Sequence, residues 1–405
     1  MMHADAPPAR WLVPTLTLAV FVNLLGAIAL GPFLPVVAAD LGVSVAMLGQ
    51  IPAVMNLLAA LLGLVIGPLA DRFGYRRTLL VGLLAVLASS LATGLAPTFP
   101  ILILVTLVGA IGRAAVLPVS QAVVATRFAD ETLRRAALGR ISTGQSGAVI
   151  LGIPLLTTIA ALLHWRGAFF VLAALALVVS SILVRMLPLD EPRAGGATRL
   201  RSILAAYGPL LRHRPSLALI LGGWLGNGSF WVIGTYVGAF YVQRHGFSTQ
   251  EVGWVYLAIG LGALVGQLLA GGRLGSRPGP LVIASRTAFG CLTGASLLLP
   301  LPAPVAVALL TLGMVAQGLS NVGAIILLSS GAPTGRATAL TVNGSAASLA
   351  GALGGGLGGL LLAVGGYLTL GWCVLILALT AAGVVWWSRI PYSPLSPPRR
   401  FSAAC

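Results

Sequence analysis

The sequence contains no lysine and only 8 aspartate and glutamate residues in 405 positions. Charged residues make up 8% of the chain, whereas soluble domains carry roughly 25%. The formal net charge is +16, but the arginines stand in short clusters between apolar runs. A nucleic-acid-binding face would need a soluble basic patch, so this class is excluded. The shortage of charge and a mean hydropathy of +1.01 indicate a membrane protein.

Residues that carry enzyme chemistry are also scarce. The three cysteines, Cys291, Cys373 and Cys405, have no metal-ligand spacing and imply no disulfide framework. No cluster of acid, base and nucleophile falls within an apolar run, and no glycine-lysine loop for a nucleotide phosphate is present. We therefore expect no enzyme activity, no metal and no cofactor.

Long apolar runs dominate the sequence. A membrane span needs about 20 mostly apolar residues, and splitting the longest runs at proline and glycine signals predicts twelve spans. The run 11–39 is too long for a signal peptide and is taken as a retained first span. The expected spans are 11–39, 41–70, 78–96, 100–126, 141–163, 167–187, 215–243, 252–272, 279–299, 305–330, 337–363 and 367–388.

The chain is expected to be an all-α membrane protein with two pseudo-symmetric halves of six helices. The predicted organisation is an N-terminal half at 1–187, a polar linker at 188–214, a C-terminal half at 215–390 and a tail at 391–405. The loops on one side of the membrane contain only two arginines, Arg166 and Arg244, and the loops on the other side contain many more. The arginine-rich side, which also holds both termini, is therefore predicted to be cytoplasmic. Abundant Ala, Gly and Arg without Lys suggest a bacterial plasma membrane.

The segment "GPLADRFGYRR", residues 67–77, follows the second predicted span. It resembles the loop signature G-x-x-x-D-R-x-G-R-R/K of the major facilitator superfamily, which stands at this place in that family. The resemblance implies the two-half, twelve-helix fold and a cytoplasmic latch in which Asp71 faces the positive N-terminal end of span eleven. The positions that match are Gly67, Asp71, Arg72, Gly74, Arg76 and Arg77.

Span five contains "GQSGAVILGIP", residues 144–154. It resembles the antiporter motif of drug-efflux members of the family, with Gly-Ile-Pro in place of Gly-Pro at its end. The resemblance places Gly144, Gly152 and Pro154 at the gate. Close packing of small residues, which membrane helices use generally, is an alternative interpretation of the same glycines.

Arg113 lies near the centre of span four. An arginine there costs at least about 2.5–3.5 kcal/mol on insertion scales, which makes it a functional candidate. Efflux members resembling this chain often carry a span-four arginine linked to proton coupling, but that arginine aligns at Thr106. Two interpretations are open: a role in substrate binding or coupling, or a structural arginine satisfied by span-five carbonyls and by Gln145 or Ser142. We expect Arg113 to be the only buried ion.

Acidic residues are absent from the centre of every predicted span. Because a buried cation needs an anionic partner, lipophilic cations are disfavoured as substrates and neutral or anionic molecules fit better. The residues expected to contact such a substrate are Asn23, Arg113, Gln145, Asn227, Trp231, Gln317, Asn321 and Asn343.

These features favour a secondary active exporter that resembles the drug and sugar (arabinose-type) efflux permeases. It would work by alternating access of its two halves and proton antiport. An importer or exchanger of an organic anion, with Arg113 as the anion's partner, is the alternative. A membrane sensor or a membrane-embedded enzyme is disfavoured. The expected partners are the bilayer, a small-molecule substrate and protons, and no nucleic acid.

Overall fold

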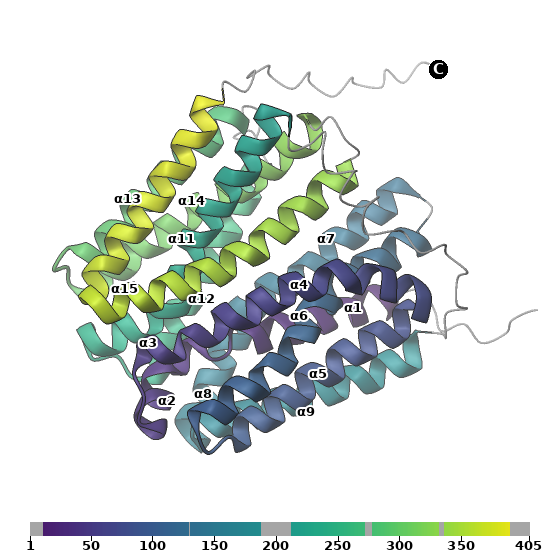
Figure 1. Ribbon diagram of the computed structural model, residues 1–405, viewed down its shortest axis with the longest axis horizontal. Helices are drawn as coiled ribbons and strands as arrows, with labels where there is room; N and C mark the ends of the chain where they lie inside the picture. The colour runs from purple at the N-terminus through teal and green to yellow at the C-terminus, as the bar shows by residue number, and fades with distance from the viewer. Residues whose placement is uncertain (1–10, 129, 188–211, 272–277, 332–335, 389–405) are drawn as a thin grey trace, which may run out of the picture.

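The computed structural model describes residues 11–128, 130–187, 212–271, 278–331 and 336–388, and nearly all of them are helical (Figure 1). Long helices are the expected outcome because hydrocarbon offers no partner for backbone N–H and C=O groups. The described chain forms two helical bundles that lie side by side (Figure 1).

The first bundle, the N half, runs from Leu12 to Met186. Gly74, with φ 94°, separates two of its helices without a loop. Its elements are α1 Leu12–Ile28, the 3-10 turn η2 Gly31–Phe33, α2 Leu34–Leu41, α3 Val45–Leu48, α4 Gln50–Phe73, α5 Tyr75–Leu95, α6 Phe99–Arg127, α7 Glu131–Gly147, the π-helix η3 Ala148–Gly152, α8 Ile153–Leu163 and α9 Trp165–Met186.

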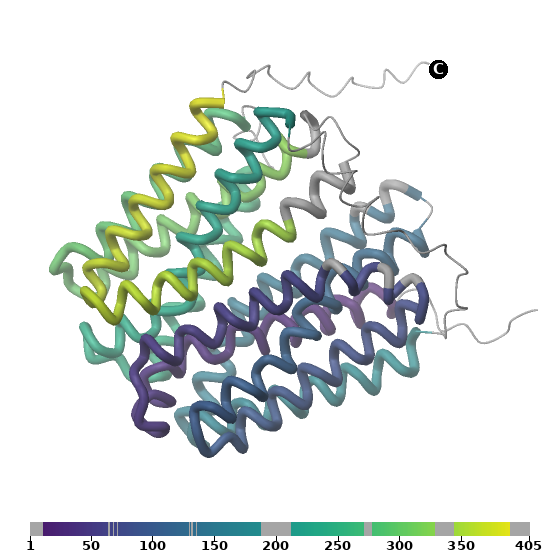
Figure 2. Tube along the Cα trace, viewed as in Figure 1, coloured from purple at the N-terminus to yellow at the C-terminus, as the bar shows by residue number. Residues whose placement is uncertain are grey.

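The second bundle, the C half, runs from Arg214 to Trp387. Its elements are α11 Arg214–His245, α12 Thr249–Gly271, α13 Pro278–Leu298, α14 Ala303–Gly331 and α15 Arg336–Trp387. At 52 residues, α15 would extend about 78 Å, far more than the roughly 30 Å hydrocarbon core. It bends at Gly365 and Gly366, where the backbone is not helical, and its two parts meet there (Figure 2).

Eleven described helical stretches are long and apolar enough to cross a membrane, and the last of them, Gly344–Trp387, includes the bend of α15. Counting the two arms of α15 separately gives the twelve spans expected from the sequence. The split expected at "VGGYL" falls at the observed bend. Most of the predicted linker, residues 188–211, and the predicted tail, 391–405, lie outside the described residues, as does the segment 272–277.

Among the described residues, the contacts between the two halves gather at one end and extend to Arg113 near mid-helix. We call this end the distal end; it contains α2, α3 and the bend of α15, and it lies opposite the terminal end, which contains Leu12, Met186, Arg214 and Trp387. At the distal end α4 packs on α15, and α12 packs on α8 and η3. Toward the terminal end the ribbons diverge (Figure 1). A methyl group on Gly67 of α4 or Gly344 of α15 would meet no atom within 4 Å there.

Candidate functional site

Arg113 joins the two halves near the middle of α6. Its Nε donates a hydrogen bond of 2.9 Å to Oδ1 of Asn56 on α4. Its guanidinium lies over the ring of Trp231 on α11, 5.0 Å from the ring centroid. A cation–π contact of this kind contributes about 0.5–2 kcal/mol, more when it is desolvated. The arginine therefore belongs to the N half but stacks on an aromatic residue of the C half.

Asn56 fixes the orientation of the arginine. Its side chain is buried, and its Nδ2 donates to the carbonyl of Pro52 at 2.9 Å, so Oδ1 faces Arg113. The structural interpretation of Arg113, with Gln145, Ser142 or span-five carbonyls as partners, is therefore wrong about the partner, because the bond goes to span two. Sequence reasoning missed Asn56, although an amide near the centre of an apolar run was the available signal.

The free edge of the Arg113 guanidinium is the chemically useful part of this site. With Nε bonded to Asn56, its Nη1 and Nη2 groups make no hydrogen bond to any residue that the structure describes. Two parallel N–H groups form a planar fork that matches a carboxylate. The side chain is only partly buried, between the two halves. The arrangement can bind an anionic or strongly polar acceptor group.

Glycines of α15 let this site form. A methyl group on Gly351 would lie 3.0 Å from Asn56 and 3.2 Å from Trp231. One on Gly354 would lie 3.0 Å from Cβ of Trp231 and would collide with the carbonyl of Gly228. The glycine-rich run of span eleven thus brings the C half close enough for Trp231 to reach Arg113.

A second arginine, Arg286, is buried inside the C half, so the expectation that Arg113 would be the only buried ion is wrong. Arg286 lies near the middle of α13, is 3% exposed and donates from Nε to Oγ of Ser320 on α14 at 2.9 Å. Its Nη1 has no hydrogen-bond partner among the residues that the structure describes. Gly222 and Gly226 of α11 make room for the guanidinium, since a methyl on Gly222 would lie 2.7 Å from Nη1.

The predicted amide residues do not converge on Arg113 through described hydrogen bonds. Asn227 donates to the carbonyl of Gly223 in its own helix at 2.9 Å. Gln317 is buried and Asn321 is half-buried, one turn apart on α14. Asn23 is buried in the N half, and its Oδ1 has no described partner. Gln145 is half-buried on α7, and the side chain of Asn343 lies outside the described residues.

The predicted latch lies at the terminal end of the N half. Gly74 forms the turn between α4 and α5, Arg72 lies over the Phe73 ring at 5.4 Å, and Arg77 is exposed. Arg76 donates from Nη2 to the carbonyl of Val184 on α9 at 2.7 Å, a contact within the N half. The side chain of Asp71 and residues 332–335 before span eleven lie outside the described residues, so the latch stays a prediction.

Span five contains a helical irregularity at its glycine pattern. Gly144 packs on the backbone of Thr17 in α1, and a methyl on Gly152 would lie 2.7 Å from Leu25. Between them the helix widens into the π-helix η3, a feature that occurs often at functional sites. On its other side this span faces the C half: a methyl on Gly260 would lie 2.7 Å from Ile150, and one on Gly253 would lie 3.4 Å from Pro154.

Tyrosines close the distal end by packing on glycines. Tyr236 of α11 packs on Gly49 of the N half and donates to the carbonyl of Gly355 at 2.8 Å. Gln50 of the N half donates to the carbonyl of Gly356 at 3.1 Å. The hydroxyl of Tyr256 lies 2.9 Å from the position of a methyl on Gly31. These contacts, which sequence reasoning did not anticipate, hold the halves together beyond Arg113.

Two six-helix halves that close at one end, around a polar residue shared at mid-depth, define a secondary transporter of the alternating-access type. The family model described as "Major Facilitator Superfamily" matches residues 16–355. The chain belongs to this superfamily and is a multi-pass membrane transporter of small molecules, not an enzyme. The family predicted from the segment 67–77 is thereby confirmed.

Relatives and solved structures agree with this assignment. The chain is 27% identical over 295 residues to "Uncharacterized MFS-type transporter YfhI" of Bacillus subtilis, covering 71% of each chain. It is 29% identical over 344 residues to the "Chloramphenicol resistance protein" of Streptomyces lividans, covering 80% of this chain and 83% of that one. A crystal structure of a bacterial homolog of the human lysosomal transporter Spinster, in an inward-facing and unoccupied conformation, shares the fold with a TM-score of 0.73, 18% identity and coverage of 95% and 98%.

Proposed function

We propose that the protein exports small neutral or anionic molecules, and that Arg113 is the group that receives an anionic or polar part of the substrate. The observation that carries this proposal is the free Nη edge of Arg113 between the two halves. A substrate carboxylate at that edge would form charge-assisted hydrogen bonds, which are about twice as strong as neutral ones.

The proposed orientation assigns one end of the bundle to each side of the membrane. The terminal end is the arginine-rich end and is assigned to the cytoplasm by the positive-inside rule. The structure then is open to the cytoplasm and closed by Tyr236 and Gln50 on the far side. A relative named for chloramphenicol resistance and the span-five pattern that resembles the antiporter motif support export over import.

Rocking of the two halves would change the surroundings of Arg113. Opening the distal end separates α4 from α15, and the stacking of Arg113 on Trp231 joins the same two halves. An anion that binds the guanidinium therefore competes with, or reorients, the Trp231 contact. Such differential contact is what a ligand needs to shift a conformational equilibrium. Protons are the proposed counter-ion, in keeping with the resemblance to antiporters.

Everted membrane vesicles with an acidified interior test the proposal. We expect wild-type protein to accumulate an aromatic monocarboxylate and its matched primary amide only while the proton gradient is present. Arg113→Ala should lose the carboxylate much more than the amide. The control is Arg212→Ala, which removes an exposed arginine at the terminal end.

Two results would decide against export by this site. Accumulation in right-side-out vesicles with an outward-directed substrate gradient, and none in everted ones, would favour the importer or exchanger of an organic anion. If Arg113→Ala remains folded and transports the carboxylate and the amide equally poorly, Arg113 is not the partner of an anion. That result would not change the measured direction of transport.

A further inference from the structure

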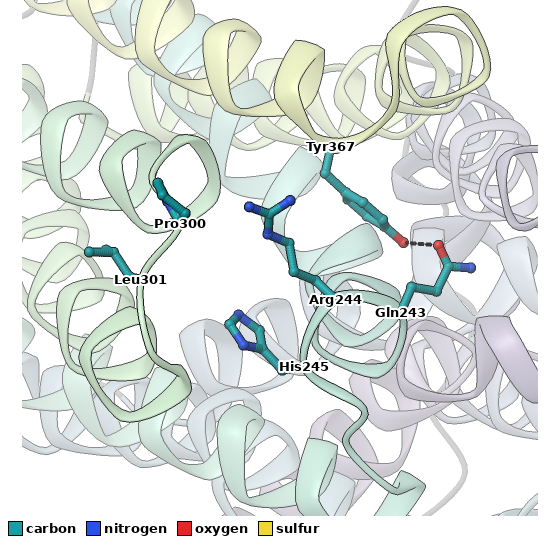
Figure 3. A pocket seen from close by; sticks show the side chains of 6 residues that line it. All are labelled: Gln243, Arg244, His245, Pro300, Leu301 and Tyr367. Atoms are coloured by element: carbon teal, nitrogen blue, oxygen red, sulfur yellow. Dashed lines mark hydrogen bonds between the residues drawn. The ribbon is translucent and has the colours of Figure 1, made fainter.

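The distal end of the C half contains a hollow of about 650 Å³ that is separate from the Arg113 site. It is bordered by the end of α11, the turn between α13 and α14, and the residue that follows the bend of α15. Figure 3 shows Arg244 and His245 pointing into the space between the α13–α14 turn on one side and Gln243 and Tyr367 on the other. The lining residues are Gln243, Arg244, His245, Pro300, Leu301 and Tyr367.

The two distal arginines of the chain differ in what surrounds them. Arg166 forms an ion pair of 2.5 Å with Asp40 and donates to the carbonyl of Ala96 at 3.2 Å. Arg244 makes no hydrogen bond or ion pair with any residue that the structure describes, yet it points into the hollow. The positive-inside rule disfavours arginine at this end of the bundle. Arg166 is paired with a carboxylate, whereas the exposed Arg244 leaves its guanidinium available toward the hollow.

The other polar groups of the hollow are arranged as donors. The hydroxyl of Tyr367 donates to Oε1 of Gln243 at 2.9 Å, which leaves the amide Nε2 of Gln243 as a donor. His245 is held by aromatic rings: it stacks on Tyr241 at 5.3 Å and meets Phe240 edge-on at 5.5 Å. None of the six lining residues is acidic. A rim of guanidinium, imidazole and amide donors fits an anion with several acceptor oxygens.

We propose that this hollow, the distal anion pocket, binds a phosphate group, either on a phospholipid headgroup or as the free ion. The pocket lies at a helix end, where headgroups of the leaflet stand, and Pro300 and Leu301 give it an apolar wall beside the cationic groups. Arginine is the side chain best suited to phosphate because its planar fork matches two oxygens.

Occupancy of the distal anion pocket would tie α11 to the bend of α15 within the C half. A bound phosphate bridges Arg244 on α11 to the bend of α15 beside Tyr367. Beneath the pocket, a small apolar void lined by Phe240 and Tyr367 extends to Tyr236, the tyrosine that packs on Gly49 of the N half. The ligand thus stabilises the two C-half helices that contribute Tyr236 and the bend of α15 to the distal end.

Thermal unfolding of the purified full chain tests the pocket. The midpoint is measured while a short-chain phosphatidylglycerol, a short-chain diacylglycerol or inorganic phosphate is added. We expect phosphatidylglycerol to raise the midpoint and the diacylglycerol to leave it unchanged. Arg244→Gln should weaken the apparent affinity by about tenfold or more, as expected for loss of a charge-assisted hydrogen bond. Arg212→Gln, which removes an equal charge at the terminal end, should bind like wild type.

Inorganic phosphate distinguishes a site for free phosphate from a site for a phospholipid headgroup. A shift with both phosphate and the lipid identifies a site for the free anion, and a shift with the lipid alone identifies a headgroup site. Broadening of the ³¹P resonance on addition of protein gives a second readout that is independent of stability. No shift and no broadening with either probe, or equal binding by Arg244→Gln and wild type, would overturn the proposal.

Discussion

Two arginines lie near mid-depth in this transporter, and their surroundings differ. Arg113 lies between the halves, is held by one bond to Asn56 and stacks on Trp231 of the opposite half. Arg286 lies inside the C half, is 3% exposed and is enclosed by Gly222, Gly226 and Ser320. Only Arg113 lies on a surface that changes when the halves move. We therefore propose a transport role for Arg113 and a packing role for Arg286.

Replacing each arginine by methionine gives the largest expected difference. Arg113→Met removes the proposed partner of the anion, so transport of an aromatic monocarboxylate should fall about tenfold to a hundredfold, the range for a lost hydrogen bond to a charged group. Arg286→Met should keep transport near wild type, because a buried ion can often be replaced by an apolar side chain of similar volume without loss. Initial rates in vesicles, normalised to folded protein, measure both.

A substitution of Gly222, the glycine beside Arg286, should lower the stability of the protein without changing its selectivity between carboxylate and amide. In Gly222→Val the new side chain would meet Nη1 of Arg286, Val385 and the carbonyl of Ala381, since even its Cβ lies within 2.7–3.1 Å of them. Overpacking of this kind costs about 1–3 kcal/mol of unfolding free energy. A lower thermal midpoint with an unchanged ratio of carboxylate to amide transport is expected. A changed ratio would assign the Arg286 region to the substrate path.

Asn56→Leu should weaken the Arg113 site without removing its charge. The substitution leaves Nε of Arg113 without its described partner, so the fork loses its fixed orientation. We expect a rise of several-fold in the KM for the carboxylate, with a smaller change for the amide. The matched change in the C half is Ser320→Ala, which removes the Nε partner of Arg286 and should leave both KM values unchanged.

Trp231→Phe should have the smallest effect. Phenylalanine keeps an aromatic face but stacks less strongly on a cation than tryptophan does. A loss of about 0.5–1 kcal/mol in the contact corresponds to a change of roughly two- to fivefold in substrate affinity. Trp224→Phe on the same helix is the control. An equal change in the two variants would show that the stacking on Arg113 has no special role.

Much of the fold could be predicted from the sequence because hydrocarbon imposes strong constraints. Apolar runs of span length predicted the helices, and "VGGYL" predicted the bend at Gly365 and Gly366. Arg113 was found because a charge in an apolar run stands out. Arg286 was missed, although it interrupts the ninth span in the same way. The signal was present in the sequence at both positions.

The partners of these residues could not be predicted in the same way. The bond from Arg113 to Asn56 joins residues 57 positions apart, and its stacking on Trp231 depends on how closely α15 approaches through Gly351 and Gly354. Closure by Tyr236 also depends on which end of the bundle is shut. Such contacts follow from tertiary packing and conformational state, and a single sequence contains no periodic signal for them.

Direct binding of an aromatic monocarboxylate to purified protein, measured by calorimetry, tests the central claim most directly. The account predicts that Arg286→Met binds the carboxylate like wild type and that Arg113→Met loses binding by about tenfold or more, while both variants remain folded. Binding that survives in Arg113→Met and disappears in Arg286→Met would contradict it, because the anion would then be held inside the C half and not between the halves.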